Sequence, residues 1–201
     1  KQGKAVVLLE SPTEFGRCVL INQARGAAKA VMHFVETGRR HIGLILPPEE
    51  GGGVWKARLE GYRQALRDKG LNYHPDLTVY AEWLGLAPGA AATRQLLAQA
   101  PNVDAVLYGS DSLASGGLQA LRAMNRSVPG DIAVIGFDDD PMNDALVPPL
   151  ASVRQPFEKT AAAGVGLLLD TLEKGDASHR ILSLETELVL RVSGGPGRSA
   201  S

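Results

Sequence analysis

Short apolar segments alternate along the chain with longer amphipathic segments. Runs of apolar, often β-branched residues predict strands, and apolar positions three and four residues apart predict helices. The predicted strands are residues 5–9, 18–21, 41–46, 77–83, 105–108 and 132–137. The predicted helices are residues 24–36, 54–69, 88–99, 112–124 and 157–174. Such alternation is typical of an α/β fold in which helices cover both faces of a parallel sheet.

The pattern changes after the proline pair Pro148–Pro149. Residues 152–156 are predicted to form an extended connector, and residues 182–192 alternate apolar and polar positions as an edge strand does. Residues 194–201 are rich in glycine and serine and are predicted to be disordered. Residues 51–53 lack the spacing of a phosphate-binding loop, so we expect a mobile loop there.

Composition narrows the possible functions. The 201 residues are 44% hydrophobic and carry a formal net charge of -1, so we do not expect this chain alone to bind nucleic acid. It contains no apolar run of membrane-spanning length and no signal-peptide core, which favours a cytoplasmic protein without membrane contact. The single cysteine, Cys18, excludes an internal disulfide, and the four histidines are scattered. We therefore predict no cofactor and no metal site built from cysteine or histidine.

An acidic triplet, residues 138–140, directly follows the predicted strand 132–137. Ligands of open α/β sheets bind beyond the carboxyl ends of the strands. Three interpretations remain open at this point. Asp138 and Asp140 could hold Mg²⁺ in a phosphohydrolase, one aspartate could cap a helix in a solvated turn, or a carboxylate could accept hydrogen bonds from ligand hydroxyls.

Other polar and aromatic residues follow neighbouring strands to the same edge. They are Ser110 and Asp111 after strand 105–108, Trp83 at the end of strand 77–83, and Arg58 early in the helix after strand 41–46. An aromatic ring, a guanidinium and a carboxylate suit a polyhydroxylated ligand. The ring covers a sugar or base face, and each charged group binds hydroxyls with about 1.5–3 kcal/mol per hydrogen bond.

Four segments together resemble the LacI/GalR (lactose-repressor) family of transcriptional regulators. They match, in family order, the patterns G-H-x-x-I-x-x-I, R-x-x-G-[FY]-x-x-A-L, V-P-x-D-I-x-V-[IV]-G-[FY]-D-[DN] and P-P-L-T-[ST]-[IV]-x-Q. The matching residues are 38–45, 58–66, 128–139 and 148–156. The third segment, which contains Asp138, is the most diagnostic.

The resemblance implies a periplasmic-binding-protein-like fold of two lobes, with the first lobe incomplete. The chain opens at what resembles the third strand of that lobe, so we expect a fragment without the helix-turn-helix headpiece that contacts operator DNA. The expected partial N-terminal lobe comprises residues 1–22 and 156–178, and the expected C-terminal lobe comprises residues 23–155 and 179–193. The implied function is to bind a small sugar-like or nucleoside-like effector between the lobes, without catalysis.

The resemblance also implies roles for individual residues. Effector contacts are expected at Arg58, Asp138, Trp83, Ser110, Asp111 and Asn22. Many members have asparagine at the position of Ser110, and an aspartate is common at that of Asn22. Gln155 and Phe157 match the segment that crosses between the lobes, where a hinge or pocket-floor role is expected.

An incomplete first lobe would expose the apolar face of helix 24–36, which predicts a homodimer that covers it. Two alternatives to a regulator remain. One is the sugar-binding protein of a transporter, which needs a secretion signal. The other is the Mg²⁺-dependent phosphohydrolase, which needs a lysine and a serine or threonine at later strand ends.

Overall fold

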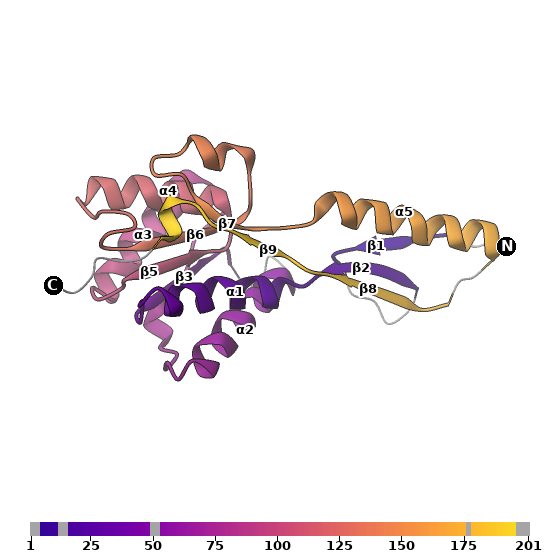
Figure 1. The fold of residues 1–201 in the computed structure, drawn as a ribbon, viewed down its shortest axis with the longest axis horizontal. Coiled ribbons are helices and arrows are strands. Elements are labelled where there is room, and N and C mark those ends of the chain that lie inside the picture. Colours follow the sequence, from indigo (N-terminus) through magenta and orange to yellow (C-terminus); the bar gives the residue numbers. More distant parts are fainter. Residues whose placement is uncertain (1–4, 12–15, 49–52, 176–177, 196–201) are drawn as a thin grey trace. The chain divides into compact units, whose positions relative to one another are not determined.

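The computed structural model describes residues 5–11, 16–48, 53–175 and 178–195, which fall into two compact units (Figure 1). Unit 1 comprises Lys1–Asn22 and Gln155–Thr186, and unit 2 comprises Gln23–Arg154 and Glu187–Ser201. Gln155 and residues 179–186 therefore group with unit 1, although the sequence analysis assigned them to the C-terminal lobe. No helix in the described part of the chain combines the length and hydropathy that a membrane span requires.

Unit 2 is built on a six-stranded sheet with the order β4-β3-β5-β6-β7-β9. The strands are β3 (Ile42–Leu46), β4 (Thr78–Tyr80), β5 (Ala105–Tyr108), β6 (Ala133–Asp138), β7 (Ala151–Arg154) and β9 (Glu187–Val189). Neighbouring strands are parallel except β7 and β9, which are antiparallel. The parallel register brings the carboxyl ends of β3 to β7 to one edge, which we call the carboxyl edge.

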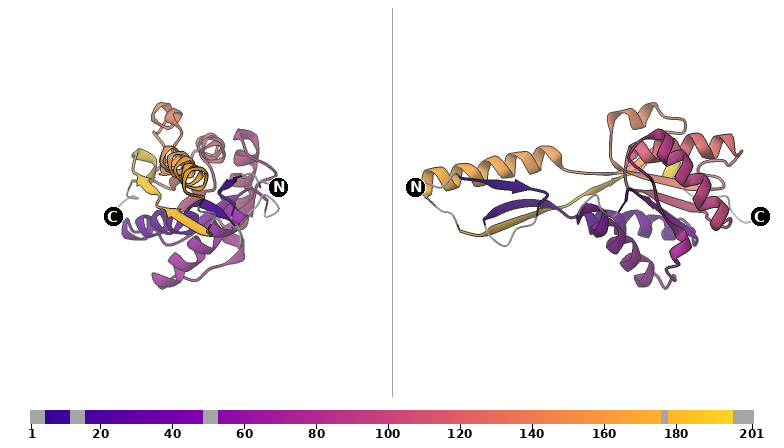
Figure 2. Two further views of the ribbon diagram at one scale, coloured as in Figure 1. Left: turned by 90° about the vertical axis from the view of Figure 1, so that its right-hand side faces the viewer. Right: turned by 180° about the vertical axis from the view of Figure 1, so that it is seen from behind.

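Helices cover both faces of this sheet (Figures 1 and 2). The pair α1 (Gln23–Glu36) and α2 (Gly53–Asp68) packs on one face, and the pair α3 (Leu86–Gln99) and α4 (Asp111–Ala123) packs on the other. Successive side chains of a strand point to opposite faces, so the central strands need apolar residues at every position. All five residues of β3 are buried for this reason.

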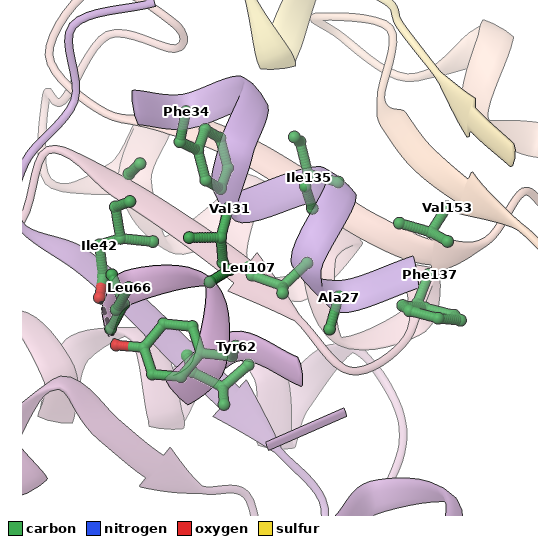
Figure 3. Close-up of a cluster of buried hydrophobic side chains, with 14 of the residues drawn as sticks. Ala27, Val31, Phe34, Ile42, Tyr62, Leu66, Leu107, Ile135, Phe137 and Val153 are labelled. Atoms are coloured by element: carbon green, nitrogen blue, oxygen red, sulfur yellow. Dashed lines mark hydrogen bonds between the residues drawn. The ribbon is translucent and has the colours of Figure 1, made fainter. Parts of the chain in front are cut away.

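Figure 3 shows the core beneath α1 and α2. Val31 and Phe34 of α1 and Tyr62 of α2 are fully buried against Leu107 of β5 and Ile135 of β6. The predicted exposure of the apolar face of helix 24–36 is therefore wrong. The sheet and α2 of the same unit cover that face, and no missing element is needed to do so.

Two glycines shape this helix pair. A Cβ at Gly61 would overlap the carbonyl oxygen of Ala24, so only glycine lets α2 approach α1 this closely. Gly38 has a φ of +92° and follows the end of α1, and the next amide, from Arg39, donates to the Phe34 carbonyl at 2.9 Å. This arrangement is a Schellman-type helix stop.

Unit 1 contains a three-stranded parallel sheet with the order β1-β2-β8 and one long helix. The elements are β1 (Val7–Leu9), β2 (Arg17–Ile21), β8 (Arg180–Leu184) and α5 (Phe157–Lys174). Cys18 lies on the central strand β2 and is fully buried. An apolar groove of about 410 Å³ runs between β1 and α5, and Val165, Leu169 and Leu172 of α5 are exposed.

The structure departs from the sequence prediction in several segments. Residues 182–192 do not form one strand, because the segment divides into β8 in unit 1 and β9 in unit 2. The predicted connector 152–156 is largely β7, whose backbone pairs with both β6 and β9. The predicted strand 77–83 is shortened to β4.

The two predicted flexible segments lie largely outside the described residues. Residues 196–201 of the predicted tail and residues 51 and 52 of the predicted loop belong to that undescribed part. Gly53 begins α2, and Gly194 ends the 3₁₀ helix η4 (Val192–Gly194). Gly194 is buried and its carbonyl oxygen lies 2.6 Å from Nε2 of His33, so the prediction of disorder is wrong at that residue.

Candidate functional site

The guanidinium of Arg58 is held in place at the carboxyl edge of unit 2. Arg58 lies in the second turn of α2 and is 3% exposed. Its Nε donates to Oε1 of Gln23 at 2.9 Å, and its Nη1 donates to the carbonyl oxygen of Gly109, just after β5. Its Nη2 lies 4.0 Å from Oδ1 of Asp138. These contacts hold the long charged side chain of Arg58 in one orientation.

Two aromatic rings add to this anchoring. Cζ of Arg58 lies 3.6 Å from the centroid of the Phe137 ring and 4.6 Å from that of the Trp55 ring. A guanidinium over an aromatic face gains about 0.5–2 kcal/mol from the charge distribution of the ring. Trp55 lies one turn before Arg58 on α2, and Phe137 immediately precedes Asp138 on β6. The guanidinium of Arg58 on α2 therefore packs against Phe137 near the end of strand β6, with Trp55 beside it.

Asp138 ends β6 in an unusual backbone conformation. Its φ is +117° and that of Asp139 is +62°, and neither residue is a glycine. A non-glycine residue in such a backbone conformation destabilises the fold by about 1–3 kcal/mol. The conformation persists only where the surrounding structure imposes it, typically at a functional site. The side chain of Asp138 is 38% exposed, whereas that of its partner Arg58 is buried. Asp138 is therefore the more accessible of the two charged groups.

The three aspartates of residues 138–140 have different tasks. Asp139 accepts hydrogen bonds from Nε of Arg154 at 2.6 Å and from Nη1 of Arg191 at 2.7 Å. Asp140 caps the 3₁₀ helix η3 (Pro141–Ala145) by accepting from the Met142 amide at 2.8 Å. Their carboxylates thus serve separate partners, and within the described ranges no three acidic, histidine or cysteine side chains group as metal ligands. The capping role that the sequence left open belongs to Asp140.

Ser110 and Asp111 begin α4. The hydroxyl of Ser110 accepts a hydrogen bond from the Leu113 amide at 3.2 Å and so caps the helix. Asp111 is 4% exposed, and its carboxylate accepts hydrogen bonds from Ser152, Asn143 and the Asp140 amide. Burial raises the pKa of Asp111 despite these bonds. Its carboxylate is therefore committed to protein donors and does not reach outward as the sequence-based prediction requires.

Trp83 lies three residues beyond the end of β4 and is 68% exposed. The other three predicted residues belong to unit 1. The side chain of Asn22 donates from Nδ2 to Oε1 of Glu185 at 3.3 Å. Its backbone N–H donates to the Leu184 carbonyl at 2.8 Å. Gln155 is buried, and Phe157, the first residue of α5, is 55% exposed. Their predicted roles in binding or in a hinge remain predictions.

A family model described as a periplasmic binding protein-like domain matches residues 31–193. This match covers most of the chain, including the strands and helices that carry Arg58 and Asp138. The chain belongs to the periplasmic binding protein-like domain family. The two-lobed α/β fold class that the motifs implied is thereby confirmed.

Relatives of this periplasmic binding protein-like chain regulate transcription according to their names. The HTH-type transcriptional regulator CelR of Thermobifida fusca is 39% identical over 184 residues, which cover 91% of this chain and 53% of CelR. The lactose operon repressor of Klebsiella pneumoniae is 32% identical over 183 residues, which cover 91% of this chain and 50% of the repressor. The predicted resemblance to the lactose-repressor family is confirmed, and the chain spans about half the length of the curated relatives it matches.

The structural comparison agrees with the sequence comparison. A solved structure of a transcriptional regulator CelR–cellobiose complex superposes with a TM-score of 0.87 at 36% identity. The superposition covers 94% of this chain and 58% of that chain. The fold of the periplasmic binding protein-like domain is therefore shared over nearly the whole of the present sequence.

Sequence reasoning missed two residues of the site. Trp55 had a usable signal, because it lies three positions before Arg58 on a predicted helix and so shares its face. Gln23 had none, because its place beside Arg58 depends on the packing of α1 against α2.

Proposed function

We propose that this chain is the effector-binding domain of a LacI-type transcriptional regulator and that it binds a sugar at the carboxyl edge of unit 2. The observation that carries the proposal is the pairing of a buried, immobilised guanidinium with a half-exposed carboxylate. Arg58 offers donors, and Asp138, 4.0 Å away, offers acceptors. Binding alone explains this arrangement, and we assign no catalytic residue.

The charge balance favours a neutral ligand. A sugar hydroxyl both donates and accepts, so neighbouring hydroxyls can accept from Arg58 and donate to Asp138. Each charge-assisted hydrogen bond contributes about 1.5–3 kcal/mol. An anionic ligand such as a sugar phosphate would be repelled by the carboxylate of Asp138. Trp83 supplies an exposed aromatic ring that can cover the apolar face of a sugar.

Cellobiose is the first probe, because the similar CelR structure is a complex with cellobiose. Titration calorimetry on the full chain should detect cellobiose binding. Asp138→Asn should weaken binding about tenfold, equivalent to 1.4 kcal/mol, since an amide accepts hydrogen bonds more weakly than a carboxylate. Asp76→Asn is the matched control, because Asp76 is exposed in the 3₁₀ helix η2 (Pro75–Leu77), which precedes β4.

The outcomes separate the proposal from its alternatives. Failure of the chain to bind cellobiose, other neutral sugars or nucleosides would contradict a sugar- or nucleoside-like effector. Unchanged affinity in Asp138→Asn would remove Asp138 from the site. A transporter protein and a phosphohydrolase have less support. The similar proteins are named as regulators, and Asp140, one of the two aspartates that a phosphohydrolase would use, caps η3.

In the complete regulator, effector binding changes the affinity for operator DNA in the cytoplasm. The coupling free energy for such a response is typically about 1–3 kcal/mol. Asn22 and Gln155 stand where the chain passes between the two units, so they and Phe157 are suited to a hinge. Anisotropy of labelled operator DNA with the complete regulator, with and without cellobiose, tests the coupling. Equal DNA affinity in both conditions would contradict it.

A homodimer is the proposed oligomeric state, with a second copy covering the groove between β1 and α5 of unit 1. The groove measures about 410 Å³ and is lined by apolar residues, and exposed apolar side chains continue along α5. Patches of this kind on a soluble domain mark association sites. Sedimentation equilibrium should show a dimer that Leu169→Glu dissociates. A monomer at every concentration would exclude this interface.

A further inference from the structure

One distant carboxylate, that of Asp111, binds several groups of the turn that follows β6. Oδ2 of Asp111 accepts hydrogen bonds from the Asp140 amide and from Nδ2 of Asn143, both at 2.8 Å. Oδ1 of Asp111 accepts from Oγ of Ser152 at 2.6 Å. The same Ser152 hydroxyl accepts from the Asp139 amide at 3.0 Å. The two amides that directly follow Asp138 are thus anchored to Asp111, one through Ser152 and one directly.

The anchor is built from buried and rigid parts. Asp111, Asn143 and Ser152 are 4%, 1% and 0% exposed, so water hardly competes for their hydrogen bonds. Asp111 lies in the first turn of α4, and Ser152 lies on β7 beside β6. A Cβ at Gly136 of β6 would overlap Oδ1 of Asp111, so only glycine admits the carboxylate there.

This anchor acts where the backbone is strained. Asp138 and Asp139 both have positive φ values, +117° and +62°. A turn of this kind relaxes unless its surroundings impose it. The hydrogen bonds to the Asp139 and Asp140 amides act on the two peptide units that directly follow Asp138.

We propose that Asp111 is a positioning residue whose buried carboxylate, acting directly and through Ser152, imposes the turn that directs Asp138 towards Arg58. The sugar-binding part of this inference rests on the proposed function. The role in shaping the turn does not, and it can be measured without any ligand.

Amide hydrogen exchange by NMR on the full chain tests the turn. Asp111→Asn replaces one accepting carboxylate oxygen with an NH₂ group, which donates and cannot accept these hydrogen bonds. Both the Asp139 and Asp140 amides should then exchange at least about tenfold faster, because their protection reflects local opening of the turn. Ser152→Ala removes only the bridge, so the Asp139 amide should accelerate more than the Asp140 amide. The Ser152 variant keeps the test decisive if the Asp111 variant does not fold.

Asp131→Asn is the matched control. Asp131 also holds a loop, accepting from the amide and hydroxyl of Ser127 at 2.7 Å each, but it precedes β6 instead of following it. It should leave exchange at Asp139 and Asp140 unchanged. Wild-type exchange rates in Asp111→Asn and Ser152→Ala, or equal acceleration at every amide in all three variants, would overturn the positioning role.

A cellobiose titration adds the functional readout. Both Asp111→Asn and Ser152→Ala should raise the dissociation constant of the folded protein about tenfold, and Asp131→Asn should not. If the turn loosens while cellobiose affinity stays at the wild-type value, Asp111 shapes the turn without serving the site, and the inference fails. If the wild type binds no cellobiose, the proposed function loses its probe, and the exchange pattern alone decides the role of Asp111.

Discussion

Nη2 of Arg58 lies 4.0 Å from Oδ1 of Asp138, although one residue belongs to a helix and the other ends a strand. Arg58 is also bound by Gln23 and Gly109, so the guanidinium does not depend on Asp138 for its position. The pair is close enough for mutual attraction and too long for a strong hydrogen bond. This spacing leaves the two charges near enough for one ligand to contact both, as the proposed function requires.

Gln23→Ala should weaken sugar binding by releasing Nε of Arg58. Loss of this hydrogen bond to a buried charged group costs about 1.5–3 kcal/mol. Part of this cost should lower the free energy of unfolding, and the rest should weaken sugar binding. Calorimetry and urea unfolding of the same variant measure both parts. Gln64→Ala is the control, because Gln64 lies on α2, is exposed, and pairs with Asp68 and Arg67 of the same helix instead of with Arg58. Equal affinities for both variants would contradict the role of Gln23.

The two tryptophans should respond differently to substitution. Trp55→Leu removes a ring from Arg58 and should lower stability by about 0.5–2 kcal/mol. Trp83→Leu should leave stability within about 0.5 kcal/mol of the wild type, since this side chain is 68% exposed. Its effect should appear in sugar affinity instead. Unfolding curves and titrations of both variants test this contrast, and a large stability loss in Trp83→Leu would argue against it.

Gly61→Ala should destabilise unit 2, because the added Cβ overlaps the Ala24 carbonyl and forces α1 and α2 apart. Overpacking of this kind costs about 1–3 kcal/mol. Gly53→Ala is the control, since a Cβ there meets no atom within 4 Å. Urea midpoints of the two variants provide the comparison. A Gly61 variant as stable as the Gly53 variant would mean that the helix pair is less tightly packed than the structure indicates.

Asp111 should make stability depend on pH. Burial raises its pKa above the ordinary value of 3.8, and the nearby charge of Asp139 raises it further. The folded chain therefore holds this proton more tightly than the unfolded chain. The stabilisation from the proton is complete below the ordinary pKa and is lost as pH rises through the raised pKa. Urea unfolding across this window should show the wild type losing stability relative to Asp111→Asn, and parallel curves would contradict the raised pKa.

Much of the site could be anticipated from residue patterns. Asp138 and Ser110 follow predicted strands and Trp83 ends one, and parallel strands bring their carboxyl ends to one edge. The structure places Arg58 and Asp138 together there, as expected. It also shows the limit of that reasoning at Asp111, which follows a strand like the others but turns its carboxylate into the protein.

By itself, the sequence determined the α/β alternation, the edge of the sheet that carries the polar residues, and the family. These features are local, because a strand buried on both faces needs a continuous apolar run and a helix needs its own period. Only the tertiary structure decided that residues 182–192 divide between two sheets, that Gln23 and Trp55 hold Arg58, and how residues 138–140 divide their tasks. A local pattern encodes which face of an element is buried, whereas hydrogen-bond partners come from segments that only folding brings together.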